Sequence, residues 1–200
     1  MSAGTKIAAV ILSGGASRRM GTPKALLQFQ GETFLDRLIR IFGTVCEPVV
    51  VVVGEHADPI RSGIQRAAEV RFAVNPDPQR GMLSSLQCGL ALVPADAVAA
   101  LFLPVDHPHI EAPTVETLAQ SFRWNSAPVI VPTYLGEHGH PVCIARGVID
   151  ELLALPVEAK ASDIIHRHVA ETRYLEVSDP AVVADVDDPA AYAELLARHL

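Results

Sequence analysis

The first apolar run of the chain is Ile7-Ala-Ala-Val-Ile-Leu12, and it passes directly into Ser13-Gly-Gly-Ala-Ser-Arg-Arg-Met-Gly-Thr-Pro-Lys24. An uninterrupted apolar run of this length predicts a strand that is buried on both faces of a sheet. Gly14 and Gly15 follow the strand immediately, and glycine lets the backbone turn sharply and approach a ligand closely. The stretch therefore predicts a buried strand that ends in a ligand-binding loop.

The composition of this loop suits a triphosphate. Backbone N–H groups at the two glycines can point toward an anion, and Arg18, Arg19 and Lys24 supply cationic donors for several phosphate oxygens. The spacing differs from both the Walker A loop and the Gly-x-Gly-x-x-Gly dinucleotide fingerprint. The alternative interpretation is an exposed turn with incidental basic residues. We favour the phosphate loop because two glycines and three cations coincide just after a first strand.

The bulk composition bounds the class of protein. Residues 1–200 are enough for one domain with a substantial core, and a formal net charge of −7 gives no basic excess for binding nucleic acid. Cys46, Cys88 and Cys143 are isolated, which predicts reduced thiols and neither a disulfide framework nor a zinc site. With no signal-peptide pattern and no apolar run of about 18 residues, we expect a cytoplasmic protein without a membrane span.

Strand and helix patterns alternate along the whole chain, which predicts an α/β fold with helices on both faces of a mostly parallel sheet. After the first strand, the expected strands are 48–53, 70–74, 97–105, 129–131, 141–145 and 172–177. The expected helices are 34–42, 58–68, one capped by Ser84 or Ser85 and ending at 92, 114–122, one ending at 153, one capped by Ser162 and ending at 169, and 189–200.

Acidic residues follow the strands at positions where ligands of open α/β sheets bind, beyond the carboxyl ends. Asp106 directly follows the apolar strand 97–105. It suits either a magnesium ligand, since Mg²⁺ prefers oxygen donors and shares substrate phosphates, or a turn cap before Pro108. A second acidic cluster is Asp185-Val-Asp187-Asp188-Pro189, in which Asp188 is placed to cap a helix that begins with proline.

The loop resembles the signature Leu-Ala-(Ala/Gly)-Gly-x-x-x-Arg-Met-Gly-x-x-Lys of nucleotidyltransferases that act on small phosphorylated acceptors. Among these it looks most like the molybdenum cofactor (molybdopterin) cytidylyltransferases and guanylyltransferases, the MobA-like enzymes. The resemblance implies a Rossmann-like three-layer α/β/α fold in a single domain. It also implies a nucleotide-binding part over about 1–110 and an acceptor-binding part over about 111–200. The implied reaction transfers a nucleoside monophosphate from NTP to a phosphate monoester and releases pyrophosphate.

The same resemblance implies roles for individual residues. Asp106 stands in the family's Asp-x-Pro context, and Asp187 stands in a segment similar to its Asp-Ile-Asp-Thr-Pro; both positions bind Mg²⁺ in the family, with Asp185 as a supporting candidate. Arg19, Lys24 and Asp106 are the expected catalytic residues. Segments similar to the family's Asn-Pro and Gly-Met-x-x-Ser complete the nucleotide site, whose expected residues are Leu12, Ser13, Gly14, Gly15, Arg19, Lys24, Asn75, Gly81, Ser84 and Ser85.

On the acceptor side, Gly139-His140-Pro141 resembles the Gly-His-Pro element of the cytidylyltransferase branch. His140 suits an acceptor contact or a buried structural histidine, and it lacks the further ligands of a zinc site. The branch's Gly-Asp-x-Gly-(Ala/Leu)-Arg stretch is replaced by Val157-Glu-Ala-Lys-Ala-Ser-Asp163, where Lys160 is the candidate substitute for the arginine. The expected acceptor-binding residues are therefore His140, Pro141 and Lys160, and the altered stretch leaves the acceptor open.

The base preference rests on two opposing signals. Thr22-Pro23-Lys24 resembles the cytidylyl branch and Gly14-Gly15 the guanylyl branch, and the Gly-His-Pro element favours CTP with molybdopterin. The alternatives are GTP, or another small acceptor such as a sugar phosphate or phospholactate. A different class of function is a non-catalytic nucleotide-binding accessory protein that serves a molybdoenzyme client.

Overall fold

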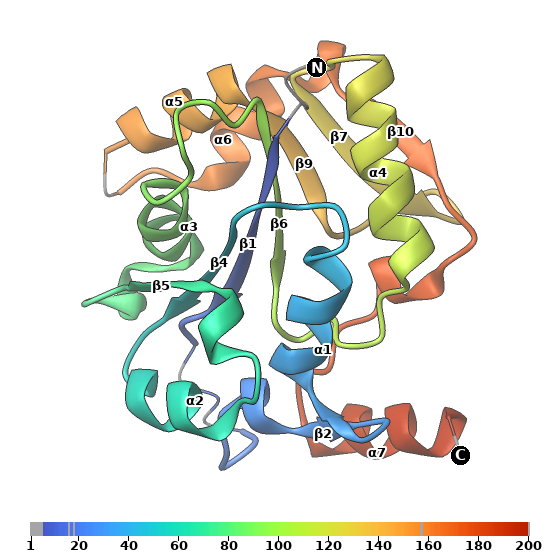
Figure 1. Cartoon of the computed structure of the whole chain (residues 1–200). Helices are drawn as coiled ribbons and strands as arrows, with labels where there is room; N and C mark the ends of the chain where they lie inside the picture. Colours follow the sequence, from blue (N-terminus) through green and yellow to red (C-terminus); the bar gives the residue numbers. More distant parts are fainter. Residues whose placement is uncertain (1–5, 16, 18, 157, 200) are drawn as a thin grey trace.

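Strand β1 (Ile7–Ser13) lies inside a mixed sheet that organises the molecule (Figure 1). The computed structural model describes residues 6–15, 17, 19–156 and 158–199. The sheet has the strand order β10-β7-β9-β6-β1-β4-β5, with β8 added beside β7. Its other strands are β4 (Val49–Val53), β5 (Arg71–Val74), β6 (Ala99–Pro104), β7 (Val129–Tyr134), β8 (Glu137–His138), β9 (Val142–Ala145) and β10 (Arg173–Glu176).

The predicted mostly parallel sheet is confirmed, with one reversal in its middle. β1 pairs in parallel with β4 and β6, and β10 pairs in parallel with β7. β9 runs antiparallel to both of its neighbours, β6 and β7. Because β9 runs the opposite way, the segment that enters it lies at the edge where the parallel strands end.

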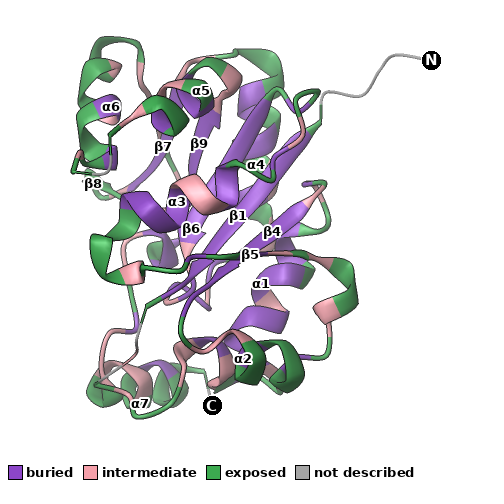
Figure 2. Ribbon diagram, turned by 90° about the vertical axis from the view of Figure 1, so that its left-hand side faces the viewer, coloured by how far each residue is buried: buried purple, intermediate pink, exposed green. Residues whose placement is uncertain are grey.

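Helices cover both faces of the sheet, as the alternating pattern predicts (Figure 2). Ile7, Ala9 and Ile11 pack into a cluster with α1 and α4, while Ala8 and Val10 face α3, α5 and α6. Full burial of each large apolar side chain contributes about 1.5–3 kcal/mol. The helices are α1 (Phe34–Phe42), α2 (Ala57–Gly63), α3 (Met82–Leu90), α4 (Ala112–Trp124), α5 (Arg146–Ala154), α6 (Ala161–Arg167) and α7 (Pro189–Arg198).

Short elements connect these layers. A two-stranded hairpin of β2 (Gln28–Phe29) and β3 (Glu32–Thr33) follows the first loop. The 3₁₀ turns are η1 (Lys24–Leu26), η2 (Ala67–Glu69), η3 (Pro78–Arg80), η4 (Val169–Glu171) and η5 (Pro180–Val182).

Helix α3 approaches the sheet closely at Gly89. A Cβ atom there would collide with Val10 Cγ1 and Val52 Cγ2, so glycine is what allows this separation. The predicted cap at Ser84 or Ser85 is wrong, because α3 begins at Met82 after Gly81, whose φ is +93°. Ser84 donates its hydroxyl to the Gly81 carbonyl at 2.9 Å from inside the first turn.

Two other helix boundaries differ from the sequence prediction. The helix expected over 58–68 covers Ala57–Gly63, because the Asp36 carboxylate accepts the N–H groups of Gln65 and Arg66 and holds them out of the helix. The helix expected after Ser162 begins at Ala161, since Asp163 accepts the N–H of Lys160 and caps that end.

The remaining strand and helix predictions are confirmed to within a few residues. Cys46, Cys88 and Cys143 are free thiols. Among the described residues, no helix combines the length and the apolar character that crossing a membrane requires.

Candidate active site

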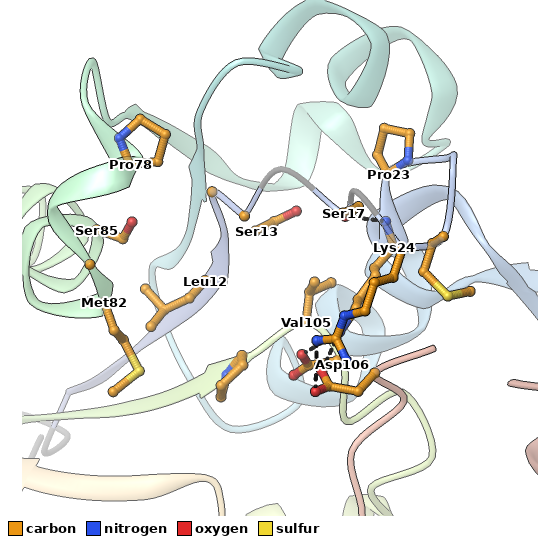
Figure 3. Close-up of a pocket in the computed structure, with 17 residues that line it drawn as sticks. Leu12, Ser13, Ser17, Pro23, Lys24, Pro78, Met82, Ser85, Val105 and Asp106 are labelled. Atoms are coloured by element: carbon orange, nitrogen blue, oxygen red, sulfur yellow. Dashed lines mark hydrogen bonds and ion pairs between the residues drawn. The ribbon is translucent and has the colours of Figure 1, made fainter. Parts of the chain in front are cut away.

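A cavity of about 380 Å³ lies at the carboxyl end of β1 (Figure 3). Its walls come from the loop after β1, the start of α3, the end of β6 and the segment before α7. The lining residues are Leu12, Ser13, Gly14, Gly15, Ser17, Arg19, Met20, Pro23, Lys24, Pro78, Gly81, Met82, Ser85, Pro104, Val105, Asp106 and Asp187. Residues from both ends of the chain therefore meet in one hollow.

The Lys24 ammonium lies between two carboxylates in this cavity. Its Nζ is 2.9 Å from Asp106 Oδ2 and 2.7 Å from Asp187 Oδ1. The second Asp187 oxygen accepts from Arg19 Nη2 at 3.0 Å. The Lys24 side chain is 12% exposed, whereas that of Arg19 is 65% exposed. Two cations and two carboxylates thus form one charge-balanced cluster, with Lys24 at its centre.

The backbone explains why these distant residues converge. The Val105 N–H donates to the Leu12 carbonyl at 3.0 Å, which places Asp106 beside the end of β1. The Val186 N–H donates to the Asp106 carbonyl at 2.8 Å and brings Asp187 to the same point. Asp188 then caps α7, as predicted, by accepting the N–H groups of residues 190 and 191.

The cluster shifts the acidities of its members. Burial lowers the pKa of Lys24, but hydrogen bonds to Asp187 and Asp106 outweigh burial and raise it above its usual value. Hydrogen bonds from Lys24 and Arg19 lower the pKa of Asp187. Lys24 therefore stays an ammonium and Asp187 a carboxylate throughout the neutral range.

On a second wall of the cavity, the backbone of Gly14 packs closely against Ser85 and Gly54. A Cβ on Gly14 would lie 3.0 Å from Ser85 Oγ, and a Cβ on Gly54 would lie 2.7 Å from the Gly14 carbonyl oxygen. Asn75 is buried behind this wall and donates to the hydroxyls of Ser84 and Ser85, both at 2.9 Å. Asn75 and Ser84 thus do not line the cavity; Asn75 holds the hydroxyl of Ser85, which does, and Ser84 is the second partner of Asn75.

His140 lies deeper, beside the end of β6. Its ring centroid is 5.3 Å from that of His107 and 6.1 Å from that of Phe102, and the backbone N–H of His140 donates to the Val182 carbonyl at 2.8 Å. Burial, and then the neighbouring His107, lower the pKa of His140 to about 4. The imidazole is therefore neutral at physiological pH, and neither His140 nor the buried Pro141 lines the cavity.

Lys160 lies in a separate hollow of about 440 Å³. Arg80, Glu158 and Ser162 also line this hollow, and Gly81 and Met82 border both it and the first cavity. The stretch that departs from the cytidylyltransferase pattern thus reaches the cavity only through the start of α3. Its first residue, Val157, lies outside the described residues, as does Arg18 of the loop.

The sequence matches the family model for the MobA-like NTP transferase domain over residues 9–172. The chain belongs to this family. Molybdenum cofactor cytidylyltransferase of Escherichia coli (strain K12) is 23% identical over 182 residues, which cover 90% of each chain. The probable molybdenum cofactor guanylyltransferase of Bacillus cereus (strain AH820) is 27% identical over 185 residues, covering 90% of this chain and 89% of the relative.

Solved structures show the same MobA-like architecture. Rv0371c from Mycobacterium tuberculosis H37Rv superimposes with a TM-score of 0.85 at 27% identity, covering 96% of this chain and 98% of that one. A structure of Rv0371c in complex with manganese superimposes with a TM-score of 0.78 at 24% identity, covering 96% and 99%. The predicted Rossmann-like three-layer fold is therefore shown by the comparison as well as by the topology.

The donor set of this MobA-like chain fits a hard divalent ion. Asp106 and Asp187 already hold one cationic group between them. In the described part of the chain, no three or more His, Cys, Asp or Glu side chains are grouped to hold a metal by themselves. Mg²⁺ is usually held by one or two carboxylates together with substrate phosphates, which is the set of ligands that this cavity can offer.

The structure brings most predicted nucleotide residues into one cavity and separates the acceptor residues from it. Of the acidic cluster, Asp187 reaches the cavity, Asp188 caps α7, and Asp185 is exposed outside it. Seven residues that line the cavity were not predicted from the sequence. Pro78 and Met82 are close in sequence to the predicted Gly81, so the motif around Gly81 could have indicated them. The other five are Ser17, Met20, Pro23, Pro104 and Val105.

Proposed function

We propose that the protein transfers a nucleoside monophosphate from NTP to a small phosphorylated acceptor and releases pyrophosphate. The observation that carries this proposal is the convergence of the glycine loop, Lys24, Asp106 and Asp187 on one cavity. Membership of the MobA-like NTP transferase family supports the same reaction class. We further propose that Mg²⁺ is the working metal and that residues 111–200 carry most of the acceptor contacts.

The nucleotide is proposed to bind along the loop after β1. Gly14 and Gly15 provide backbone N–H groups to the phosphates, while Lys24 and Arg19 offset charge on the phosphoryl oxygens. Asp106 and Asp187 would hold the divalent ion, which when bound would supply positive charge to the phosphates. Leu12, Ser13, Gly81 and Ser85 would enclose the nucleoside, with Asn75, which also bonds Ser84, supporting Ser85 from behind.

The chemistry needs no nucleophile from the protein. An acceptor phosphate is already anionic, so one of its oxygens attacks the α-phosphorus in line, and the bond to the pyrophosphate oxygen breaks. Catalysis then depends on positioning and on stabilising the charge of the transition state. His140, which is neutral above its pKa of about 4, can orient the acceptor through a hydrogen bond but does not neutralise its charge. Lys160 is the proposed cation for an outer anionic group of the acceptor.

The proposed substrates are CTP and molybdopterin. The Gly139-His140-Pro141 element favours the cytidylyl branch, and relatives of both the cytidylyl and the guanylyl type span about nine-tenths of this chain. GTP is therefore the second nucleotide to test. The replaced stretch around Lys160 makes a sugar phosphate or phospholactate the second kind of acceptor.

Pyrophosphate release tests this proposal directly. The purified protein is given CTP or GTP separately, with Mg²⁺ and fresh molybdopterin, and the reaction is repeated after chelation of the metal. Turnover with CTP alone, lost on chelation, is the expected result. Turnover with GTP alone would move the protein to the guanylyl branch, and no pyrophosphate from either nucleotide would reject molybdopterin as acceptor.

A further inference from the structure

The Lys24 ammonium lies between the two carboxylates that are proposed to hold the metal ion. It contacts Asp106 at 2.9 Å and Asp187 at 2.7 Å, and Arg19 takes the other Asp187 oxygen. We propose that Lys24 is a resident counter-cation that must leave this carboxylate pair before a divalent metal binds, and that it then moves to the triphosphate. The inference deepens the proposed function and rests on it for the identity of the triphosphate.

Lys24 and a divalent ion cannot share the pair. Mg²⁺ binds oxygen at about 2.0–2.1 Å, so an ion held by both carboxylates would lie closer to them than the ammonium does, at 2.9 Å from Asp106 and 2.7 Å from Asp187. Two cations held by the same two carboxylates repel each other strongly, because a partly buried site screens their charges less than water does. Metal binding therefore requires that the Lys24 side chain swing away.

The backbone segments that carry the two carboxylates are held in place. The Asp106 carbonyl accepts the Val186 N–H at 2.8 Å, and the residue after Asp187 caps α7. The Lys24 backbone is also tied, since its N–H donates to Ser17 Oγ at 3.1 Å. The flexible four-carbon stem of Lys24 is the part that can move, and its ammonium already lines the cavity that the phosphates would enter.

The exchange makes metal and nucleotide binding depend on each other. A metal ion releases the ammonium, and a triphosphate supplies the anionic oxygens that receive it. Each ligand therefore lowers the cost of binding the other, and this coupling must be reciprocal. Without nucleotide, the resting protein is expected to bind divalent metal weakly, since the released ammonium has no new anionic partner.

Mn²⁺ binding to the nucleotide-free protein tests this directly, with free Mn²⁺ followed by electron paramagnetic resonance. Lys24→Met and Lys24→Gln should each bind Mn²⁺ at least about fivefold more tightly than the unaltered protein, at the lower end of usual coupling factors. Lys6→Met is the matched control, because it removes an equally short ion pair, 2.7 Å to Asp96, on an exposed surface. Adding Asp106→Asn to Lys24→Met should abolish the gain.

A second measurement uses the unaltered protein. An amine-acetylating reagent labels lysines, and mass spectrometry gives the labelling rate of Lys24 with and without Mn²⁺. The metal should increase the rate at Lys24 by releasing its ammonium, while the rate at Lys6 should stay constant.

Unchanged or weaker Mn²⁺ binding in folded Lys24 variants would overturn the inference, as would an unchanged Lys24 labelling rate at saturating Mn²⁺. Neither measurement requires nucleotide or turnover. A protein that releases no pyrophosphate with molybdopterin, a sugar phosphate or phospholactate but shows the Mn²⁺ gain would therefore reject the proposed function and keep the exchange, whereas active protein without the gain would do the reverse.

Discussion

The cavity at the end of β1 and the region around His140 lie at the same edge of the sheet but differ in electrostatics. In the cavity, Lys24 and Arg19 meet Asp106 and Asp187 in direct ion pairs. Around His140, the neighbours are the rings of His107 and Phe102, and burial keeps the imidazole neutral.

Strand direction explains why the two regions adjoin. β1 and β6 end at this edge, so the residues that follow them enter the cavity. β9 runs antiparallel to β6, so Pro141, which precedes β9, lies beside the end of β6. The charged residues thus lie where loops leave the parallel strands β1 and β6. The uncharged region around His140, which we call the neutral wall, lies where the chain enters the antiparallel strand β9. We therefore propose that the first region binds phosphates and that the second contributes shape.

Asp106→Asn should give the largest effect on the charged region. The amide keeps the size of the side chain but removes one of two carboxylates that face Lys24. We expect kcat to fall about a hundredfold to a thousandfold, the range seen when one group that stabilises transition-state charge is lost. Asp96→Asn, which alters an exposed ion pair, is the control, and pyrophosphate release is the measurement. Near-normal activity would exclude Asp106 from the reaction.

Gly54→Ala should disturb the same region through packing alone. The new Cβ would lie 2.7 Å from the Gly14 carbonyl oxygen and 3.2 Å from Pro78 Cγ, so the loop must shift. We expect kcat/KM for the nucleotide to fall about tenfold to a hundredfold, because small displacements of a positioning group are costly. Gly147→Ala is the control, since nothing lies within 4 Å of its Cβ. Equal kinetics in both variants would show that the loop position is not critical.

The charged region was largely predictable from sequence. The apolar run before Gly14 predicts a buried strand, Asp106 follows another such strand, and parallel strands direct both to one edge. The pairing of Lys24 with Asp106 and Asp187 was not predicted, because 163 positions separate Lys24 from Asp187. No local sequence pattern predicts the backbone hydrogen bonds that bring the Lys24 and Asp187 segments together.

The His140 region was predictable only in part. The sequence pattern correctly identified strand β9 but did not give its direction, which depends on pairing with β6 and β7. Burial of His140 against Phe102 is likewise a tertiary property. The predicted helix boundaries were wrong where a side chain accepts backbone N–H groups that would otherwise continue the helix, as Asp36 does at the end of α2.

Acid should lower the free energy of unfolding in a specific pH window, because the neutral wall contains largely buried histidines. Burial lowers the pKa of His140 from 6.5 to about 4, and burial likewise lowers to about 4 the pKa of His109, which lies between β6 and α4. Between these values the unfolded chain binds more protons than the folded one, so stability falls as pH drops from about 6.5 to 4. Thermal unfolding at several pH values should be less acid-sensitive in His140→Gln. Equal sensitivity in the variant would show that His140 already titrates normally when folded.

Lys160→Ala should have the smallest effect and tests whether the separate hollow serves the acceptor. Lys160 is exposed and lies outside the charged cavity, so its contribution is limited to that of a solvated ion contact, about 0.2–1 kcal/mol. We expect KM for the acceptor to rise up to about fivefold, with KM for the nucleotide unchanged. Lys6→Ala, on a distant surface, controls for the loss of one positive charge. A rise in the nucleotide KM instead would mean that the hollow and the cavity act as one site, because they share Gly81 and Met82. The split between the two KM values therefore decides whether the charged cavity and the separate hollow recognise different substrates.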